Sequence, residues 1–375
     1  MIKGSAIVIG AGIVGLATAR ALALKDYAVT VIERGEKATG ASIRNFGMLW
    51  PIGQPDGLLY DRAMRSKIIW KEIADKAGIW YDEVGSLHVA HNAEEWQVLQ
   101  ELKEAFNANG RCVRLMDKTT ILNNFNGIKG EGLLGGLYSS TETIIDPREA
   151  IATVPSYLSM DLDVKFIWNK TVTHVETGMV WMGKENLQAD IVCICGGADF
   201  ETLYPEHFNK LPVTKCKLQM MRFAPPTESW RMGVSVCGGL SLVHYDAFKA
   251  APSLSQLKEK YMAEMTDYLK WGIHVMVSQN GKGELTVGDS HEYGLTFDPF
   301  DKNFINEMIL KYLNQFAVTD NWKLLQTWHG IYPKMTNGEP GIFLQADRDV
   351  YIVNSMGGIG MTMSFGFAEE MLAGI

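Results

Sequence analysis

Residues 5–33 of this 375-residue chain are SAIVIGAGIVGLATARALALKDYAVTVIE. The run begins with an apolar segment, residues 5–9, of the kind that forms a parallel strand buried on both faces. The turn GAGIVG at 10–15 follows, then an alanine-rich helix over 16–25 and a second apolar strand over 28–32. This order predicts a strand–turn–helix–strand unit with a right-handed connection. The predicted fold class is therefore α/β, with a Rossmann-like parallel sheet.

Each glycine of the turn has its own physical reason. Gly10 permits the tight turn, Gly12 lets backbone amides approach a pyrophosphate, and Gly15 lets the helix pack against its strand. The N-terminus of the helix presents N–H groups and a partial positive charge to the phosphates. Glu33, at the end of the next strand, is the expected acceptor for ribose hydroxyls, and Arg34 contacts either a 2′-phosphate or an adenine edge. These features predict dinucleotide binding, because a glycine turn kept only for packing does not require the acid.

Composition argues against several classes of protein. The chain has 35 Lys and Arg against 43 Asp and Glu, and its net charge of −8 argues against nucleic acid as a partner. The five cysteines form no CxxC pair and no zinc-type spacing, so we expect reduced thiols, a cytoplasmic location and no metal. The uncharged N-terminal stretch is similar to a signal peptide, but its glycines and length weigh against export and membrane insertion. The oligomeric state is left open.

Segments typical of a nucleotide-binding domain occur at the start, in the middle and near the end of the chain. Apolar strands predicted at 189–195 and 350–354 each run into glycines, while the intervening sequence is richer in aromatic residues and methionine. One amphipathic helix is predicted over 255–271. Two interleaved domains explain this order better than two consecutive ones. We predict a discontinuous cofactor-binding domain of residues 1–84, 141–212 and 325–375, and a mixed-sheet α+β substrate domain of residues 85–140 and 213–324.

Three further segments favour a flavin over a nicotinamide dinucleotide. ATGASIRNFGM at 38–48 is too rich in glycine, serine and asparagine for a helix, and it is predicted to form a polar loop suited to an extended cofactor. ADIVCICGGA at 189–198 predicts another strand of the sheet, which ends in glycines where a pyrophosphate would lie. GGIGMT at 357–362 supplies a third backbone-exposing turn at the start of a helix. The predicted cofactor is therefore a flavin dinucleotide.

In this order the motifs resemble those of the FAD-dependent D-amino-acid oxidase, glycine oxidase and sarcosine oxidase superfamily. The resemblance covers nearly the whole chain and includes IIDPRE at 144–149 and the segment from Trp328 to Pro340. It implies FAD between two domains, with the N-terminus of the last helix stabilising negative charge on the reduced ring. Besides the first turn, it places around the cofactor Ser42, Arg44, Asn45, Gly47, Met48, Val172, Gly196, Gly357, Gly358, Gly360 and Thr362.

The mode of flavin attachment also follows from the resemblance. Some members of the superfamily attach the flavin to a cysteine in the C-terminal region or to a histidine in the N-terminal loop. This chain has no cysteine after Cys237 and no histidine near Arg44. We therefore expect non-covalent FAD.

The sequence departs from the superfamily where the substrate carboxylate is usually held. Glycine and D-amino-acid oxidases have an arginine in a Gly-Leu-Arg-Pro type segment, and Tyr332 stands at the matching position of WHGIYPK, residues 328–334. Ile359 stands where glycine oxidase has a second arginine. The planar guanidinium suited to a carboxylate is thus absent from its usual place, which argues against a simple α-amino acid.

Single hydrogen-bond donors remain near the expected pocket, and they suit a tetrahedral anion better than a carboxylate. The chain is also similar to a subgroup associated with phosphonate breakdown, which implies aminophosphonates or their N-methyl derivatives as substrates. The candidates for substrate binding are Tyr332, Lys334, Tyr245, Arg222 and Met48, and those for catalysis are His291, His329 and Tyr332. Each has a structural alternative, such as packing for Tyr332, a backbone hydrogen bond for His329 and a solvated turn for Lys334.

The predicted function is oxidation of the C–N bond of a small primary or secondary amine. Hydride leaves the carbon next to nitrogen and water hydrolyses the imine, while His291 or His329 accepts the proton of the amine. Three alternatives stay open: a peripheral membrane FAD dehydrogenase of the glycerol-3-phosphate type, an RNA-modifying amine oxidase domain, and a non-catalytic flavin-binding protein. No basic amphipathic anchor supports the first, and the acidic balance opposes the second.

Overall fold

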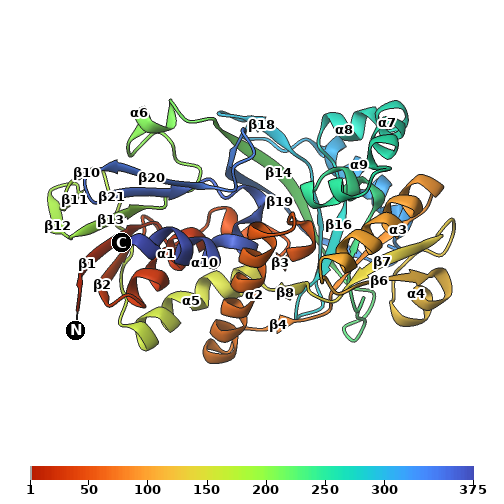
Figure 1. Ribbon diagram of the computed structural model, residues 1–375, viewed down its shortest axis with the longest axis horizontal. Coiled ribbons are helices and arrows are strands. Elements are labelled where there is room, and N and C mark those ends of the chain that lie inside the picture. The colour runs from red at the N-terminus through yellow and green to blue at the C-terminus, as the bar shows by residue number, and fades with distance from the viewer. Residues whose placement is uncertain (1) are drawn as a thin grey trace.

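The computed structural model describes residues 2–375, and its strands form two large sheets that occupy the two halves of an elongated molecule (Figure 1). The half that contains β1, β13 and β21 is built from the start, the middle and the end of the sequence, and both chain ends lie there. The other half contains the remaining segments, including most of the stretch between β14 and β19. The chain therefore passes between the halves several times.

The first large sheet has six strands in the order β20-β21-β13-β1-β2-β9, and every pair is parallel except β20 with β21. Its strands are β1 (Gly4–Ile9), β2 (Tyr27–Ile32), β9 (Lys165–Ile167), β13 (Ile191–Ile194), β20 (Ile342–Asp347) and β21 (Val350–Asn354). The α/β class and the Rossmann-like sheet predicted from residues 5–33 are confirmed.

Both faces of this sheet are covered, which explains why its central strands are apolar throughout. On one face, Val8, Val31 and Cys193 share an apolar core with a layer of four helices (Figure 1). These helices are α1 (Ile13–Ala23), α2 (Leu58–Ala77), α5 (Pro147–Leu162) and α10 (Gly360–Met371). On the other face, Ile7 and Val192 pack in a cluster with a small antiparallel sheet. That sheet comprises β10 (His174–Glu176), β11 (Met179–Met182) and β12 (Glu185–Gln188).

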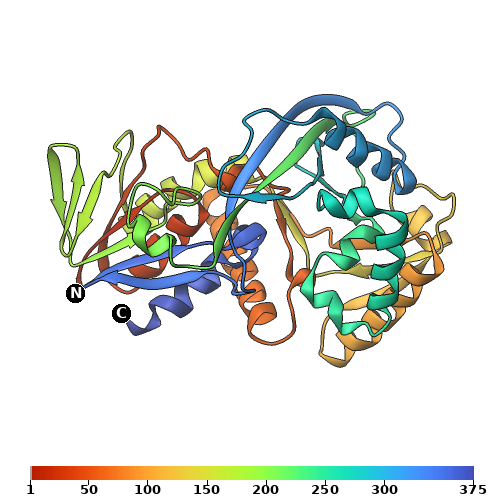
Figure 2. The same cartoon turned by 90° about the horizontal axis from the view of Figure 1, so that it is seen from above.

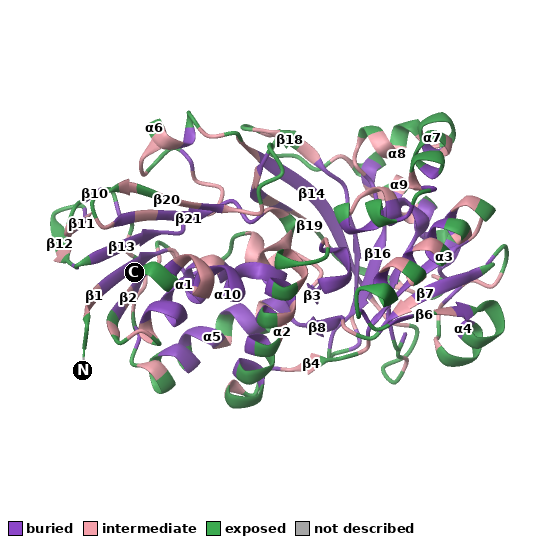
Figure 3. Ribbon diagram, viewed as in Figure 1, coloured by how far each residue is buried: buried purple, intermediate pink, exposed green. Residues whose placement is uncertain are grey.

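The second large sheet has nine strands in the order β18-β14-β17-β16-β15-β5-β7-β6, with β19 paired to β14 beside this path. Its strands are β5 (Ser86–Ala90), β6 (Val113–Asp117), β7 (Gly135–Ser139), β14 (Val213–Ala224), β15 (Ser235–Cys237), β16 (Met276–Gln279), β17 (Leu285–Gly288), β18 (Glu292–Gly294) and β19 (Lys323–Met335). Figure 3 shows the inner strands of this sheet, such as β14 and β16, buried, while the helices of this half have exposed outer sides; β18 and the first half of β19 are not buried. The helices are α3 (Ala93–Ala108), α4 (Lys118–Asn124), α7 (Leu254–Glu264), α8 (Thr266–Lys270) and α9 (Asn303–Phe316).

Two long antiparallel strands, β14 and β19, join the halves of the molecule (Figures 1 and 2). Their pairing extends from Val213 opposite Met335 to Ala224 opposite Lys323. A bridge between Lys334 and Met356 ties β19 to the segment that precedes α10. Side chains near the end of β19 are therefore placed close to the half that contains the six-stranded sheet.

The remaining elements are short. A three-stranded sheet comprises β3 (Met48–Leu49), β4 (Tyr81–Asp82) and β8 (Thr143–Ile145), and α6 spans Pro205–Phe208. Single 3₁₀ turns occupy Ala41–Ile43, Pro51–Gly53, Gly239–Val243, Asp246–Ala250, Gly357–Ile359 and Leu372–Gly374.

The prediction of one helix over 255–271 is wrong, because the segment forms two helices, α7 and α8, that are separated at Met265. The Thr266 hydroxyl donates a hydrogen bond to the Met262 carbonyl, 2.7 Å away, at this break. Such a side-chain bond competes with the backbone bonds of a continuous helix. No helix among residues 2–375 is long and apolar enough to cross a membrane.

Candidate active site

A cavity of about 1150 Å³ extends from the glycine turn after β1 into the second sheet. At one end its lining comes from the carboxyl ends of β1, β2 and β13, where ligands bind in open parallel sheets. At the other end it reaches β14, β19 and the segments that carry His244 and His274. We call the second part the inner end of the cavity.

The glycine turn has the backbone that its sequence predicts. Gly10 has φ +103°, and a Cβ there would lie 2.5 Å from the carbonyl oxygen of Cys195. Gly12 lines the cavity and is the N-cap of α1; it has no side chain to cap the helix, and of the first N–H groups only that of Ile13 donates to a side chain, Ser42 Oγ, among residues 2–375. Gly15 is outside the lining, because its role is the close contact between α1 and the turn: a Cβ there would lie 1.9 Å from the Gly10 carbonyl oxygen. The helix N-terminus is thus open to an anion.

Glu33 lines the cavity beside this turn. Its Oε2 accepts a hydrogen bond from the Ala11 backbone N–H at 2.9 Å, and its Oε1 accepts one from Gly35 at 3.0 Å. Each carboxylate oxygen keeps a lone pair for a ligand hydroxyl. Arg34 is exposed and pairs with Asp199 at 3.1 Å, and both residues also line the cavity. Val172 lies in the same lining, on the segment after β9.

The loop at 38–48 is held in place by its own polar groups. Ser42 Oγ accepts a hydrogen bond from the Ile13 backbone N–H at 3.0 Å, and Arg44 donates to the His329 carbonyl at 3.1 Å. Asn45 Oδ1 accepts from the Gly47 backbone N–H at 2.8 Å. Ser42, Arg44, Asn45 and Met48 line the cavity. Gly47 does not; it is a turn residue with a φ of +72°, and a Cβ there would lie 2.1 Å from the Ile145 carbonyl oxygen.

The third glycine segment completes the lining. Gly357, with φ +57°, Gly358 and Gly360 line the cavity at the start of α10, as does Gly196 after β13. Thr362 also lines it and accepts a hydrogen bond from the Trp50 backbone N–H at 3.0 Å. Two helix N-termini and three glycine-containing turns therefore face one elongated space, and these features fit an extended dinucleotide.

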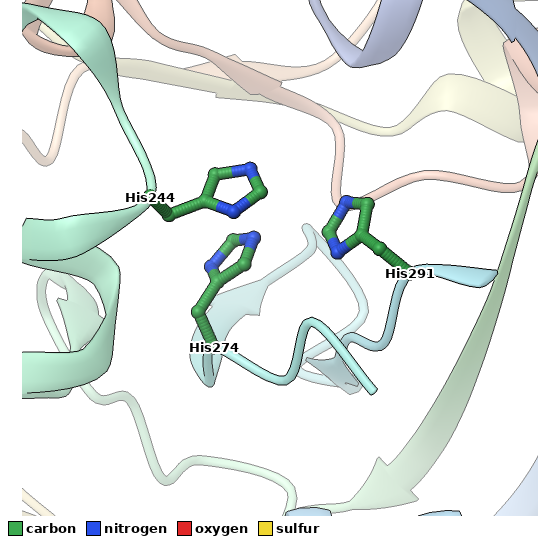
Figure 4. A group of neighbouring side chains, drawn as sticks. All are labelled: His244, His274 and His291. Atoms are coloured by element: carbon green, nitrogen blue, oxygen red, sulfur yellow. The ribbon is translucent and has the colours of Figure 1, made fainter. Parts of the chain in front are cut away.

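Three histidines meet at the inner end (Figure 4). His244 follows a 3₁₀ turn, His274 precedes β16 and His291 precedes β18. Their ligating nitrogens all lie within 4.8 Å of one another. The buried carboxylate of Asp289 lies between two of them, 3.1 Å from His274 Nε2 and 3.9 Å from His291 Nε2. Spacings of 30 and 17 residues gave no sequence signal for this cluster.

The protonation of the histidine cluster follows from its burial. Desolvation lowers the pKa of His291 to about 4 and holds the pKa values of His244 and His274 well below their usual range. His291 Nδ1 lies 2.9 Å from the Gly272 carbonyl oxygen, so this nitrogen carries the proton. The other nitrogen, Nε2, then has a free lone pair at neutral pH. A residue of this kind can accept a proton from a ligand.

Tyr332 and His329 point to opposite faces of β19, since they are three positions apart along the strand. Tyr332 packs with Cys216 and Leu218 on the cavity side, and burial holds its pKa well above its usual range, so it stays a donor. His329 Nδ1 pairs with Asp301 at 2.8 Å, although the residue also contributes to the lining.

The remaining predicted substrate residues are divided between the cavity and the core. Lys334 lines the cavity and its Nζ lies 3.3 Å from the Tyr293 hydroxyl. Tyr245 and Met48 line it as well. Arg222 does not: its buried guanidinium pairs with Glu284 at 2.9 Å.

Comparison with known families gives the class of protein. Residues 5–373 match the family described as DAO, FAD dependent oxidoreductase, and the chain belongs to this family. It is therefore an FAD-dependent enzyme. The residues that line the first part of the cavity are those that would hold FAD, which, when bound, supplies an acceptor for hydride.

Solved structures share the fold at low sequence identity. The chain is similar to glycine oxidase from Geobacillus kaustophilus, with a TM-score of 0.78, 17% identity and coverage of 100% of this chain and 94% of that one. It is also similar to L-alpha-glycerophosphate oxidase from Mycoplasma pneumoniae with FAD bound, with a TM-score of 0.76, 19% identity and coverage of 99% and 94%.

Curated relatives match over a shorter stretch. A bifunctional protein of tRNA 5-methylaminomethyl-2-thiouridine biosynthesis from Burkholderia ambifaria is 30% identical over 119 residues. The matched part is 30% of this chain and 18% of the relative. The chain thus corresponds to less than a fifth of that protein.

Proposed function

We propose that the protein oxidises the C–N bond of a small amine that carries an anionic group, an aminophosphonate or its N-methyl derivative being the best candidate. The observation that carries this proposal is the set of donors at the inner end, where Tyr332, Lys334 and the three histidines line the cavity. Within residues 2–375 the arginines of the lining are Arg34 and Arg44, and both are engaged elsewhere. Single hydrogen-bond donors such as a hydroxyl, an ammonium group or an imidazole suit a tetrahedral anion better than a planar carboxylate, which a free guanidinium binds best.

The side chains have distinct tasks in this proposal. Tyr332 and Lys334 bind the anionic group, and His291 Nε2 takes a proton from the substrate ammonium. The neutral amine then gives up hydride from the adjacent carbon, and water hydrolyses the imine to a carbonyl compound and an amine. Tyr245 and Trp50, whose ring centroids lie 6.5 Å apart, cover the inner end and reduce access of water.

The closest competing proposal concerns an alcohol instead of an amine. The similarity in fold to a glycerophosphate oxidase fits an anionic substrate equally well. The two proposals differ in the atom next to the oxidised carbon. A buried neutral imidazole such as that of His291 favours the amine, because an ammonium needs only a weak base to lose its proton.

A larger substrate is the second candidate, because the matched relatives are named for methylaminomethyl modification of tRNA. The net charge of −8 and the burial of His274 and His291 at the inner end favour a free small molecule.

A panel of substrates tests the proposal. The flavin-loaded protein is incubated with aminophosphonates, N-methyl amines, glycine, glycerol phosphate and tRNA, and both peroxide formation and dye reduction are recorded. We expect turnover with an anionic amine and none with glycerol phosphate or tRNA. The proposal would be refuted if glycerol phosphate were the only compound oxidised, or if none of the amines were oxidised.

A further inference from the structure

The pair formed by His244 and His274 has no task in the mechanism above. Their ring centroids lie only 3.8 Å apart with an interplanar angle of 31°, and both line the inner end of the cavity. His291 lies nearby, with ring centroids 4.7 Å from His244 and 5.2 Å from His274 (Figure 4). Three imidazoles packed this closely in a buried space require an explanation.

The groups around the pair include one acid and one ammonium group. Asp289 lies 3.1 Å from His274 Nε2, and burial raises the pKa of its carboxyl group well above the usual range. On the far side of His291, the ring of Tyr293 stacks at 6.2 Å, and Lys334 Nζ lies 5.2 Å from the centre of that ring. Tyr245 packs edge-on against His274 at 5.6 Å. The cluster is therefore flanked by one carboxyl group, which burial favours in its neutral form, and one ammonium group.

One nitrogen of the cluster has a missing partner. His274 is 3% exposed, and its Nδ1 makes no hydrogen bond within residues 2–375. A buried polar atom without a partner is costly, so native sites seldom contain one unless a ligand or water completes it. Asp289 Oδ1, which lies 3.1 Å from His274 Nε2, also makes no hydrogen bond within residues 2–375, so this oxygen and His274 Nδ1 are both left for a proton or a ligand.

We propose that His244 and His274, together with Lys334, form a binding subsite for a tetrahedral oxyanion of the phosphate, phosphonate or sulfate class, and that the subsite takes up a proton when the anion binds. As an imidazolium, His274 donates Nε2–H to Asp289 and Nδ1–H to the anion. The stacked ring of His244 supplies a second donor. The subsite deepens the proposed function, on which it rests for the statement that the anion is part of the substrate.

An anion fits this cluster better than a metal ion does. Three nitrogens bound to one zinc ion at about 2.0–2.1 Å would lie roughly 3.4 Å apart, with their rings spread around the ion. Here the rings of His244 and His274 lie against each other with centroids 3.8 Å apart and a tilt of 31°, and the positive charge of Lys334 opposes a second cation. Donors that approach from separate directions also fit a tetrahedral group better than a planar carboxylate.

The sign of the pH effect follows from the burial of the rings. Without a ligand, burial and the positive charge of Lys334 hold the pKa values of His244 and His274 low, so both are neutral at pH 7. A bound dianion favours the charged form of its neighbours. Binding is therefore coupled to proton uptake, and the affinity for the anion falls as the pH rises, by about tenfold per pH unit for one proton.

Titration of the flavin-loaded protein with sulfate, inorganic phosphate and acetate tests the subsite. Sulfate does not itself titrate between pH 6 and 9, so its dissociation constant reports the protein alone. Binding is followed by calorimetry and by the change in the visible flavin spectrum. We expect sulfate and phosphate to bind, acetate to bind at least tenfold more weakly, and the dissociation constant of sulfate to rise about tenfold per pH unit.

Variants assign the binding to the pair. His274→Gln and His244→Gln should each weaken sulfate binding at least tenfold while the flavin content stays unchanged. His174→Gln is the matched control, because His174 is exposed, pairs with Glu176 and is not one of the residues that line the cavity. The pH series on the unmodified protein needs no variant, so a variant that fails to fold does not end the test.

Several results would overturn the proposal. These are the absence of sulfate binding, binding that is independent of pH, or binding that survives in both variants. One divalent metal ion per chain, lost in the variants and removable by a chelator without effect on sulfate, would also overturn it. None of these measurements requires turnover. Anion binding without oxidation of any amine would refute the proposed function alone, and oxidation without anion binding would refute the subsite alone.

Discussion

Glu33 Oε2 accepts a hydrogen bond from the backbone N–H of Ala11 at 2.9 Å, which fixes the end of β2 against the glycine turn after β1. The carboxylate is thereby held where it can also accept from a ribose. Glu33→Gln replaces one charged acceptor by an amide donor, and charge-assisted hydrogen bonds contribute about 1.5–3 kcal/mol. We expect FAD to bind roughly tenfold to a hundredfold more weakly, measured by titrating apoprotein with FAD.

The exposed Glu36, three residues along the chain, provides the control for this change. Glu36→Gln removes the same charge without touching the turn. Equal loss of FAD affinity in both variants would show that net charge, and not the position of Glu33, determines binding.

A methyl group added at Gly15 should abolish cofactor binding. Its Cβ would lie 1.9 Å from the carbonyl oxygen of Gly10, which is backbone and cannot move without opening the turn. Gly374→Ala is the matched control outside the cavity lining, because no described atom lies within 4 Å of a Cβ there. We expect Gly15→Ala to be purified without flavin and with a lowered melting temperature, and Gly374→Ala to match the parent protein. A flavin-loaded Gly15→Ala variant would contradict the packing role.

Loss of a hydrogen-bond donor at the inner end should weaken binding of the substrate and leave binding of the cofactor unchanged. Tyr332→Phe and Lys334→Met each remove one hydrogen-bond donor from the cavity lining. We expect KM for an anionic amine to rise about tenfold to a hundredfold in each case, since a bond to a charged group contributes about 1.5–3 kcal/mol. Lys323 is exposed, so Lys323→Met is the control for the loss of one positive charge outside the cavity. Unchanged KM in both variants would remove these residues from the site.

His88 should make the protein less stable in acid. It is buried between Trp50 and Phe248, neither nitrogen has a hydrogen-bond partner within residues 2–375, and burial lowers its pKa to about 3. In the unfolded chain its pKa is near 6.5, so between these values the unfolded state binds one more proton. The stability that this group contributes is present above about pH 6.5 and is lost, by about 1.4 kcal/mol per pH unit, as the pH falls toward 3.

Thermal unfolding at pH 7.5 and pH 5 measures this effect. The parent protein should lose more stability between the two values than His88→Leu does. The exposed His174→Gln should behave as the parent does. An identical acid dependence of the parent and of His88→Leu would show that His88 is not buried in the neutral form.

The cofactor half of the site was predictable because its signals are local. Gly10, Gly12 and Glu33 lie within one strand–turn–helix–strand unit, and the spacing of that unit is dictated by the geometry of the turn. The glycines at 357–360 and Gly196 follow apolar strands in the same way. In each case neighbouring residues in the sequence are neighbours in space.

The inner end was less predictable because it depends on contacts between distant segments. His244 and His291 are conspicuous in the sequence, but His274 precedes an apolar strand and Asp289 lies among small residues, so neither stands out. The pairing of β16 with β17 brings them together. Arg222 is the opposite case, a residue that was expected to bind the substrate but lies in the core. Its ion-pair partner Glu284, which holds it there, is 62 residues away in the sequence.

Anaerobic mixing of the flavin-loaded protein with a small anionic amine tests the central claim most directly. The account predicts that the visible absorbance of the flavin bleaches within the mixing experiment, that the carbonyl product forms in equal amount, and that the same amine without its anionic group bleaches it far more slowly. The account would be contradicted if the flavin absorbance persisted with every anionic amine, or if the amine bleached the flavin equally fast with and without its anionic group.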